Sequence, residues 1–186
     1  MQRRDFIGNL ALGAAGIGLG SSFTTKTHRS AADKVVLALI GCGGRGRDVL
    51  GGIVRENENV EVKYMCDVNE TLEGVPKDIE EYFKKQGYAP VFVTDMRKVF
   101  DDKDVDAVVI ATPEHWHVLA AIWALQSGKH VYVEKNPTLS IWEGQKLIEA
   151  VKKSNKVLQI GFQNRSAPYA FSARDYIKSG TSSITQ

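Results

Sequence analysis

Apolar and polar positions form short blocks that repeat along the chain from Lys34 onward. Six short runs are rich in Val, Ile and aromatic residues, as β-strands are, and they span residues 34–41, 60–67, 89–95, 105–112, 130–135 and 157–163. In the longer segments between them, apolar residues recur every three or four positions, which predicts helices over residues 46–57, 75–87, 113–128, 141–154 and 167–180. Strands and helices therefore alternate through almost the whole chain.

This alternation predicts an α/β fold. Several strands, above all residues 105–112, are apolar on both faces, as a parallel sheet covered by helices on both sides requires. Six strands joined by right-handed crossovers make a doubly wound parallel Rossmann sheet, with the expected strand order 3-2-1-4-5-6. We assign residues 33–180 to this dinucleotide-binding domain.

The first 32 residues differ from the rest in composition. Arg3 and Arg4 precede a mildly hydrophobic, Gly-rich stretch at residues 7–19, which is short for a membrane span of ~20 apolar residues. This arrangement is typical of a twin-arginine signal peptide, and the small residues 30–32 offer a cleavage site. We therefore expect residues 1–32 to be a signal and linker that directs the chain through the twin-arginine export machinery to the periplasm, with no stable membrane span after cleavage. An uncleaved N-terminus that tethers the chain to the membrane is the alternative.

Charge and cysteine content narrow the function. The net charge is +2 and the basic residues are scattered, so nothing in the charge indicates a nucleic-acid partner. Cys, His and carboxylate residues do not occur with the spacing of metal ligands, so we expect no metal site. Cys42 and Cys66 fall at the ends of neighbouring strands, where either a single disulfide or two buried thiols would fit. We favour two buried thiols.

A glycine-rich turn follows the first strand. Gly41, Gly43 and Gly46 form G-x-G-x-x-G between a strand and a helix, with Gly44 and Arg45 inside the turn. Such a turn lets a pyrophosphate approach the backbone and the N–H groups at the start of the helix. The pattern therefore predicts a dinucleotide site, although a plain tight turn would also use glycines.

Asp67 ends the second strand, 21 residues after Gly46. A carboxylate at this place accepts hydrogen bonds from the hydroxyls of the adenosine ribose and repels a 2′-phosphate. Asp67 therefore favours NAD over NADP as the cofactor. A helix-capping or loop carboxylate is the alternative reading of this residue.

Further candidates lie at the carboxyl ends of the fourth and fifth strands, where ligands bind in open α/β sheets. Thr112 and Pro113 are expected to border the cofactor. His117 is the histidine that we expect to face the cleft, although a hydrogen-bonded helix histidine fits the pattern equally well. Glu134 and Lys135 end the fifth strand, where they form either a catalytic pair or a surface ion pair.

The segments IGCGGRG, DAVVIATPEHWH, HVYVEK and GFQNR, in this order and at these spacings, resemble the N-terminal domain of the glucose–fructose oxidoreductase / inositol dehydrogenase (Gfo/Idh/MocA) family. The resemblance implies an NAD- or NADP-dependent oxidoreductase that acts on CH–OH groups of a sugar or polyol. It also implies that Lys135 is catalytic and lies beside the nicotinamide, and that Glu134 positions the cofactor or the lysine. Gln163 is then expected to contact the cofactor and Arg165 the substrate, and a loop with ordinary surface hydrogen bonds is the alternative for this segment.

The chain departs from the family pattern in two respects. The family has proline directly after its lysine, whereas Asn136 stands here and Pro137 comes one residue later. The family also has a second, substrate-holding domain, and we expect residues 181–186 to be only its truncated start. Without that domain we expect a chain that binds NAD weakly, does not turn over sugar and self-associates through an uncovered apolar face.

Two other functions fit the same residues. One is an NAD-dependent glycosidase of the same superfamily, which oxidises and re-reduces its sugar within one cycle. The other is a standalone, non-catalytic module that binds a nucleotide.

Overall fold

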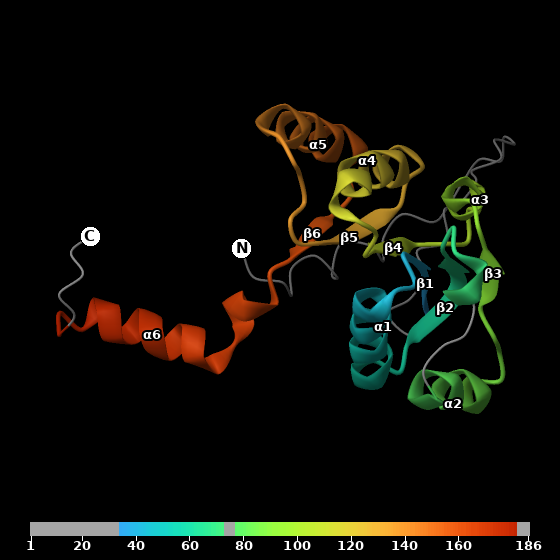
Figure 1. Ribbon diagram of the computed structural model, residues 1–186, viewed down its shortest axis with the longest axis horizontal. Helices are drawn as coiled ribbons and strands as arrows, with labels where there is room; N and C mark the ends of the chain where they lie inside the picture. Colours follow the sequence, from blue (N-terminus) through green and yellow to red (C-terminus); the bar gives the residue numbers. More distant parts are fainter. Residues whose placement is uncertain (1–33, 73–76, 182–186) are drawn as a thin grey trace, which may run out of the picture. The chain divides into compact units, whose positions relative to one another are not determined.

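The six predicted strands form one parallel sheet (Figure 1). The computed structural model describes residues 34–72 and 77–181. Its strands are β1 (Val35–Ile40), β2 (Val60–Cys66), β3 (Val91–Val93), β4 (Ala107–Ile110), β5 (His130–Glu134) and β6 (Leu158–Gly161). Their order, β3-β2-β1-β4-β5-β6, confirms the predicted one. The predicted signal at residues 1–32 and, apart from Thr181, the predicted start of a second domain lie outside the described residues.

Helices cover both faces of this sheet (Figure 1). They are α1 (Gly44–Glu56), α2 (Lys77–Gln86), α3 (Met96–Asp101), α4 (His117–Gln126) and α5 (Ile141–Ser154). The chain also forms α6 (Pro168–Lys178) after β6, and the short 3-10 turns η2 (Glu70–Leu72), η3 (Glu114–Trp116) and η4 (Gln163–Ser166). On one face, Leu50 of α1 and Phe83 of α2 pack in one apolar core. On the other face, Val99 of α3, Ala121 of α4 and Leu147 of α5 pack in a second core.

The central strand β1 is buried on both sides. Leu39 lies in the core beneath α1 and α2, whereas its neighbour Ile40 lies in the core beneath α3, α4 and α5. Both side chains are almost completely buried. Successive residues of a strand point to opposite faces, so a strand between two layers of helices must be apolar at every position. This is the pattern that the sequence shows in the first and fourth strands.

Helix α3 is not predicted by the sequence pattern. It spans six residues between β3 and β4, which is too short to show a helical period. Asp95 starts it by accepting a hydrogen bond from the Arg97 backbone N–H at 3.0 Å, as N-cap residues do. The helix buries Val99 and Phe100 in the core. Its first turn brings Met96 and Arg97 to the carboxyl edge of the sheet.

The predicted helix at residues 167–180 is present as α6. None of its described residues is buried. It exposes Tyr169, Phe171 and Tyr176. No helix in the described ranges is both long enough and apolar enough to cross a bilayer.

Asp102 ties the end of α3 to β2. Its carboxylate lies 2.7 Å from Lys63 Nζ and accepts a hydrogen bond from the Tyr64 hydroxyl at 2.8 Å. The hydrogen bond from Lys63 lowers the pKa of Asp102 to about 2, against a smaller opposing effect of burial. The tie therefore needs the ionised form of the carboxyl group.

We expect this tie to make the fold sensitive to acid. Because the pKa of Asp102 is lowered from 3.8 to about 2, its contribution to stability is complete above pH 3.8 and is lost as the pH falls through about 2. Asp102→Asn should therefore flatten the decrease of the urea midpoint over that range. Asp104→Asn is the matched control, because exposed Asp104 also pairs with Lys63, at 3.0 Å. Equal acid sensitivity in the two variants would contradict this account.

Candidate functional site

The glycine turn after β1 leaves no space for side chains at two of its positions. A Cβ at Gly41 would lie 2.6 Å from the Ala111 carbonyl carbon, and the φ of Gly41, +95°, is one that other residues rarely adopt. A Cβ at Gly46 would lie 1.9 Å from the Gly41 carbonyl oxygen. At Gly43, by contrast, no described atom lies within 4 Å of the added Cβ. The turn is thus tight toward the sheet and open at Gly43.

The open space beside Gly43 lies at the start of α1. Gly43 is the N-cap residue of this helix, and no side chain of the described residues caps it. The first turn holds Arg45 and no acidic residue. Helix N-termini carry unpaired N–H groups and a partial positive charge, so this end of α1 is suited to an anion such as a pyrophosphate.

Asp67 is fixed beside the same turn. Its Oδ2 accepts a hydrogen bond from the Cys42 backbone N–H at 2.7 Å, and its Oδ1 accepts one from the Asn69 backbone N–H at 2.9 Å. A carboxylate has about four acceptor positions, so further positions are left for a ligand. Asp67 therefore acts as a loop carboxylate that joins the ends of β1 and β2, and it can also accept hydrogen bonds from a ribose diol.

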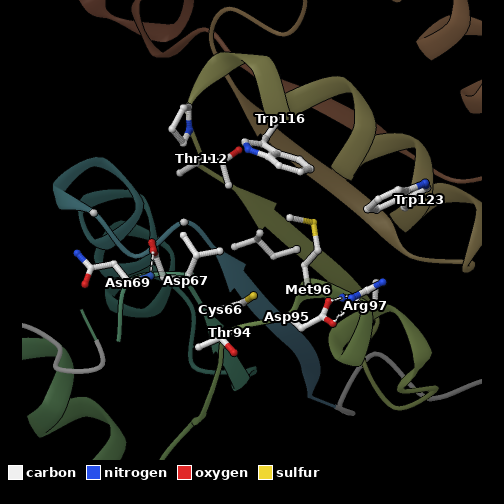
Figure 2. Close-up of a pocket in the computed structure, with 16 residues that line it drawn as sticks. Cys66, Asp67, Asn69, Thr94, Asp95, Met96, Arg97, Thr112, Trp116 and Trp123 are labelled. Carbon is white, nitrogen blue, oxygen red and sulfur yellow. Dashed lines mark hydrogen bonds and ion pairs between the residues drawn. The ribbon is translucent and has the colours of Figure 1, made fainter. Parts of the chain in front are cut away.

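A cavity of about 890 Å³ lies next to Asp67 (Figure 2). This volume is typical of a site for a small molecule or cofactor. Figure 2 shows Trp116 on one side of the cavity and Asp67 and Thr94 on the other. Its lining residues are Ile40, Gly41, Gly43, Cys66, Asp67, Val68, Asn69, Thr94, Asp95, Met96, Arg97, Ala111, Thr112, Pro113, Trp116 and Trp123.

Five residues predicted to bind the cofactor line this cavity, namely Gly41, Gly43, Asp67, Thr112 and Pro113. The hydroxyl oxygen of Thr112 is buried and has no hydrogen-bond partner among the described residues. Buried polar atoms are normally paired, so this hydroxyl is available to a bound polar group.

The sequence did not single out the aromatic and α3 side chains of the cavity. Trp116 and Trp123 come from η3 and α4, and Met96 and Arg97 come from α3. A Trp within a helical pattern indicates a core residue as readily as a ligand contact. Because α3 itself was not predicted, nothing in the sequence placed its residues at the sheet edge.

Glu134 forms a second polar group at the same edge. It is 4% exposed, and it accepts hydrogen bonds from Arg45 Nη2 at 2.8 Å and from the Tyr132 hydroxyl at 2.9 Å. Burial raises the pKa of Glu134, but the hydrogen bonds from Arg45 and Tyr132 outweigh burial, so the pKa lies below its ordinary value. Glu134 is therefore a buried carboxylate that is paired with the glycine turn.

Gly161 makes room for this pair. It is the partner of Glu134 in the register of β5 and β6. A Cβ at Gly161 would lie 2.3 Å from the Tyr132 hydroxyl oxygen and 2.7 Å from Glu134 Oε1. Only glycine at this position allows Tyr132 and Glu134 to meet as they do.

Lys135 follows directly after β5 and its side chain is exposed. The peptide bond between Lys135 and Asn136 is cis. Strands of a parallel sheet end at one edge, so Lys135 lies at the same edge as the glycine turn. It is not among the residues that line the cavity.

His117 does not face the cavity, contrary to the cleft-facing position predicted from the sequence. Its ring is 1% exposed. Its Nε2 lies 2.8 Å from the Thr112 carbonyl oxygen and its Nδ1 lies 2.8 Å from the Asn136 carbonyl oxygen. Both nitrogens contact backbone carbonyls, so neither is free for a cofactor. His117 is instead a hydrogen-bonded helix histidine, which is the alternative that the sequence left open.

The structure places Gln163 and Arg165 in η4, where both side chains are exposed. The Arg165 guanidinium lies 6.0 Å from the centroid of the Phe162 ring. Neither residue lines the cavity. Their assignment to cofactor and substrate stays a prediction.

The two cysteines are free and buried. Burial, reinforced by the charge of Asp67, raises the pKa of both thiols to about 12, so neither is a reactive thiolate at neutral pH. Across the described residues, no three His, Cys, Asp or Glu side chains gather as metal ligands would.

Residues 35–162 match the GFO_IDH_MocA family, described as an oxidoreductase family with an NAD-binding Rossmann fold. A levoglucosan dehydrogenase of Pseudarthrobacter phenanthrenivorans is 38% identical over 87 residues, which are 47% of this chain and 22% of that protein. An alpha-N-acetylgalactosaminidase of Shewanella oneidensis is 31% identical over 103 residues, which are 53% of this chain and 22% of that protein.

A solved structure shares the fold. The WlbA dehydrogenase of Bordetella pertussis, crystallised with NADH and UDP-GlcNAcA, superposes with a TM-score of 0.65 at 24% identity. The match covers 80% of this chain and 40% of that one. The chain thus matches less than half the length of each of these three proteins.

The open side of the glycine turn gives a test that separates binding from folding. We expect Gly43→Ala to weaken NADH binding about tenfold, or ~1.4 kcal/mol, because the added methyl group would stand where the pyrophosphate approaches. The urea midpoint should fall only slightly, since a Cβ there meets no described atom and alanine is a poorer N-cap residue than glycine. Gly52→Ala is the matched control, because a Cβ at Gly52, farther along α1, also meets no described atom within 4 Å. Unchanged NADH affinity in Gly43→Ala would contradict this account.

Asp67 gives a test of cofactor choice. We expect Asp67→Asn to weaken NADH binding and to narrow the preference for NADH over NADPH by about tenfold or more, because removing the negative charge ends the repulsion of the 2′-phosphate. The amide oxygen can still accept from the Cys42 N–H, which keeps Asp67→Asn joined to the turn, whereas the hydrogen bond from the Asn69 N–H is lost. Fluorescence titrations with both dinucleotides measure the preference, and an unaltered ratio of the two affinities would refute the role given to Asp67.

Proposed function

Because the chain belongs to this oxidoreductase family with an NAD-binding Rossmann fold, we propose that it is the NAD-binding half of an oxidoreductase that acts on a CH–OH group of a sugar or polyol. The observation that carries the proposal is the open glycine turn and Asp67 beside one cavity, at the sheet edge where β5 also ends before Lys135. The levoglucosan dehydrogenase relative supports a sugar-like substrate.

The residues at this edge suit the successive parts of a dinucleotide. The cavity beside Asp67 would hold the adenosine, with Asp67 on the ribose and the apolar side chains of Met96 and Trp116 against the base. The start of α1 would hold the pyrophosphate. The nicotinamide would then reach the end of β5, near Glu134 and Lys135. NAD supplies the hydride acceptor when it is bound there.

In this proposal, Lys135 donates a hydrogen bond to the oxygen of the substrate's reacting CH–OH group. Its ammonium group is a hydrogen-bond donor at the end of β5. A donor aimed at the oxygen of the reacting CH–OH group orients it and stabilises the negative charge that develops on that oxygen as its proton passes to solvent water. Glu134 is engaged with Arg45 and Tyr132, so its part is to hold the end of β5 in place.

The 186 residues alone are expected to bind NAD without turnover. Lys135 is exposed to water in this chain, whereas sites of this chemistry exclude water from the reacting atoms. The wall that would cover Lys135 and hold the substrate is proposed to come from the part of the relatives' length that this chain does not match.

We also propose that the chain is exported through the twin-arginine pathway to the periplasm. The support is the Arg3-Arg4 pair before the weakly apolar residues 7–19. That pathway carries folded proteins, so NAD could be loaded before export and retained afterwards. Self-association of the chain through its exposed apolar residues belongs to the same proposal.

The galactosaminidase relative favours a second candidate, a glycosidase that uses NAD within each cycle. Such an enzyme returns its hydride to the sugar, so it produces no net NADH. A dehydrogenase accumulates NADH in proportion to the sugar consumed. The two functions therefore differ in one measurable quantity, the NADH formed per substrate converted.

The direct test is NADH binding by the full chain, read from quenching of the cavity residues Trp116 and Trp123. We expect saturable binding that NAD competes away, and no formation of NADH when NAD and a panel of sugars and polyols are added together. Trp142→Phe is the control for the exposed tryptophan outside the cavity, and it should leave the signal intact. A chain without measurable dinucleotide affinity would contradict the proposal. Sugar-dependent NADH formation would contradict the expected inactivity.

Replacement of Arg3 and Arg4 by lysine tests the export. The double variant keeps the positive charges, so a pathway that reads charge alone should still accept it, whereas twin-arginine export should be lost. We expect the wild-type chain in the periplasmic fraction and the variant in the cytoplasm. Export of the lysine variant at the wild-type level would refute this route.

A further inference from the structure

Asn136, the residue after Lys135, is held by Glu114 of η3 and by His117, the first residue of α4. Glu114 Oε1 accepts a hydrogen bond from Asn136 Nδ2 at 3.1 Å and a longer one from the Asn136 backbone N–H at 3.4 Å. His117 Nδ1 lies 2.8 Å from the Asn136 carbonyl oxygen. Asn136 is therefore contacted at its backbone N–H, its side chain and its carbonyl.

The His117 side of this arrangement is anchored in the core. The ring is 1% exposed, and its other nitrogen, Nε2, lies 2.8 Å from the Thr112 carbonyl oxygen. A buried polar contact of this kind is not readily replaced by water. His117 therefore joins the backbone that follows β4 to the backbone that follows β5.

We propose that Glu114 and His117 are positioning residues for Lys135. They fix Asn136 on both sides of its α-carbon, and in doing so they set where the Lys135 backbone stands at the sheet edge. The side chain of Lys135 is exposed, so the adjacent backbone is the part through which the protein can control its position. The inference rests on the proposed function, because that function gives Lys135 its role.

The hydrogen bonds to Asn136 restrain the backbone, as the ring of a proline at this position would do covalently. A proline at position 136 would fix its own φ and restrict the preceding residue, Lys135. Asn136 lacks that ring, but it brings a backbone N–H and a side-chain amide, and Glu114 accepts from both. These hydrogen bonds thereby restrain the backbone directly after Lys135, at the position where the family pattern has proline.

Glu114 is the residue to change, because His117 is buried and its replacement would test folding as well. Glu114→Ala removes the acceptor, whereas Glu114→Gln keeps a carbonyl oxygen in place and is the matched control. The readout is ¹⁵N relaxation of the Lys135 and Asn136 backbone amides in the full chain without NADH. We expect increased mobility at both amides in the Ala variant, wild-type values in the Gln variant, and equal urea midpoints.

Two further variants, Asn136→Pro with and without Glu114→Ala, test whether Glu114 acts on Lys135 by restraining Asn136 rather than by stabilising the fold as a whole. In the background of Asn136→Pro, the ring replaces the restraint that Glu114 supplies, so Glu114→Ala should no longer change the Lys135 amide. Acetylation of Lys135, followed by mass spectrometry, adds a functional readout with exposed Lys152 as the internal reference. In the wild-type chain, bound NADH should slow the acetylation of Lys135. Glu114→Ala should reduce this slowing about threefold or more, which is the size of coupling between contacting residues.

The outcomes are distinguishable. Unchanged relaxation of Lys135 in Glu114→Ala would overturn the inference, and so would an equal change in Glu114→Gln. If no variant and no wild-type chain bound NADH, the proposed function would fail, while the relaxation comparison would still decide whether Glu114 fixes the Lys135 backbone.

Discussion

The close packing of the glycine turn against the ends of β1 and β4 is the constraint on which the site depends. A Cβ at Gly41 would overlap Ala111, and one at Gly46 would overlap the Gly41 carbonyl oxygen. Because neither position has a side chain, α1 can start directly at the sheet edge. The same turn contains Cys42, whose backbone N–H donates to the Asp67 carboxylate. One backbone segment thus places both the start of α1 and Asp67.

The two carboxylates at this edge of the sheet, Asp67 and Glu134, differ in their surroundings. Asp67 accepts from backbone N–H groups and borders the cavity, so its carboxylate is accessible from that cavity. Glu134 is buried and paired with Arg45, which comes from the first turn of α1. That pair joins the glycine turn to β5. A dinucleotide that binds the turn would therefore contact the element that also holds the end of β5.

Much of the fold could be predicted because a parallel sheet between two helical layers leaves a strong pattern. Strands such as β1 must be apolar at every position, and the helices between them are long enough to show their period. Helix α3 has six residues and shows no such period. Because α3 was not predicted, the part of the cavity wall that Met96 and Arg97 form was not predicted either. The positions of Gly41, Gly43 and Asp67 beside the cavity could be predicted because they depend on backbone geometry and on strand ends, which the sequence order determines.

His117 and Glu134 show what sequence order could not decide. Both follow strands that end at the same edge, and both were expected near the ligand. Their partners decide their roles, and those partners lie far away in the chain: Asn136 for His117 and Arg45 for Glu134. A histidine whose two nitrogens contact carbonyls holds the backbone in place, and a carboxylate that is paired and 4% exposed does the same. Lys135 lies in the chain between Glu134 and Asn136, so its exposed side chain stands on a backbone that is held on both sides by contacts with buried Glu134 and His117.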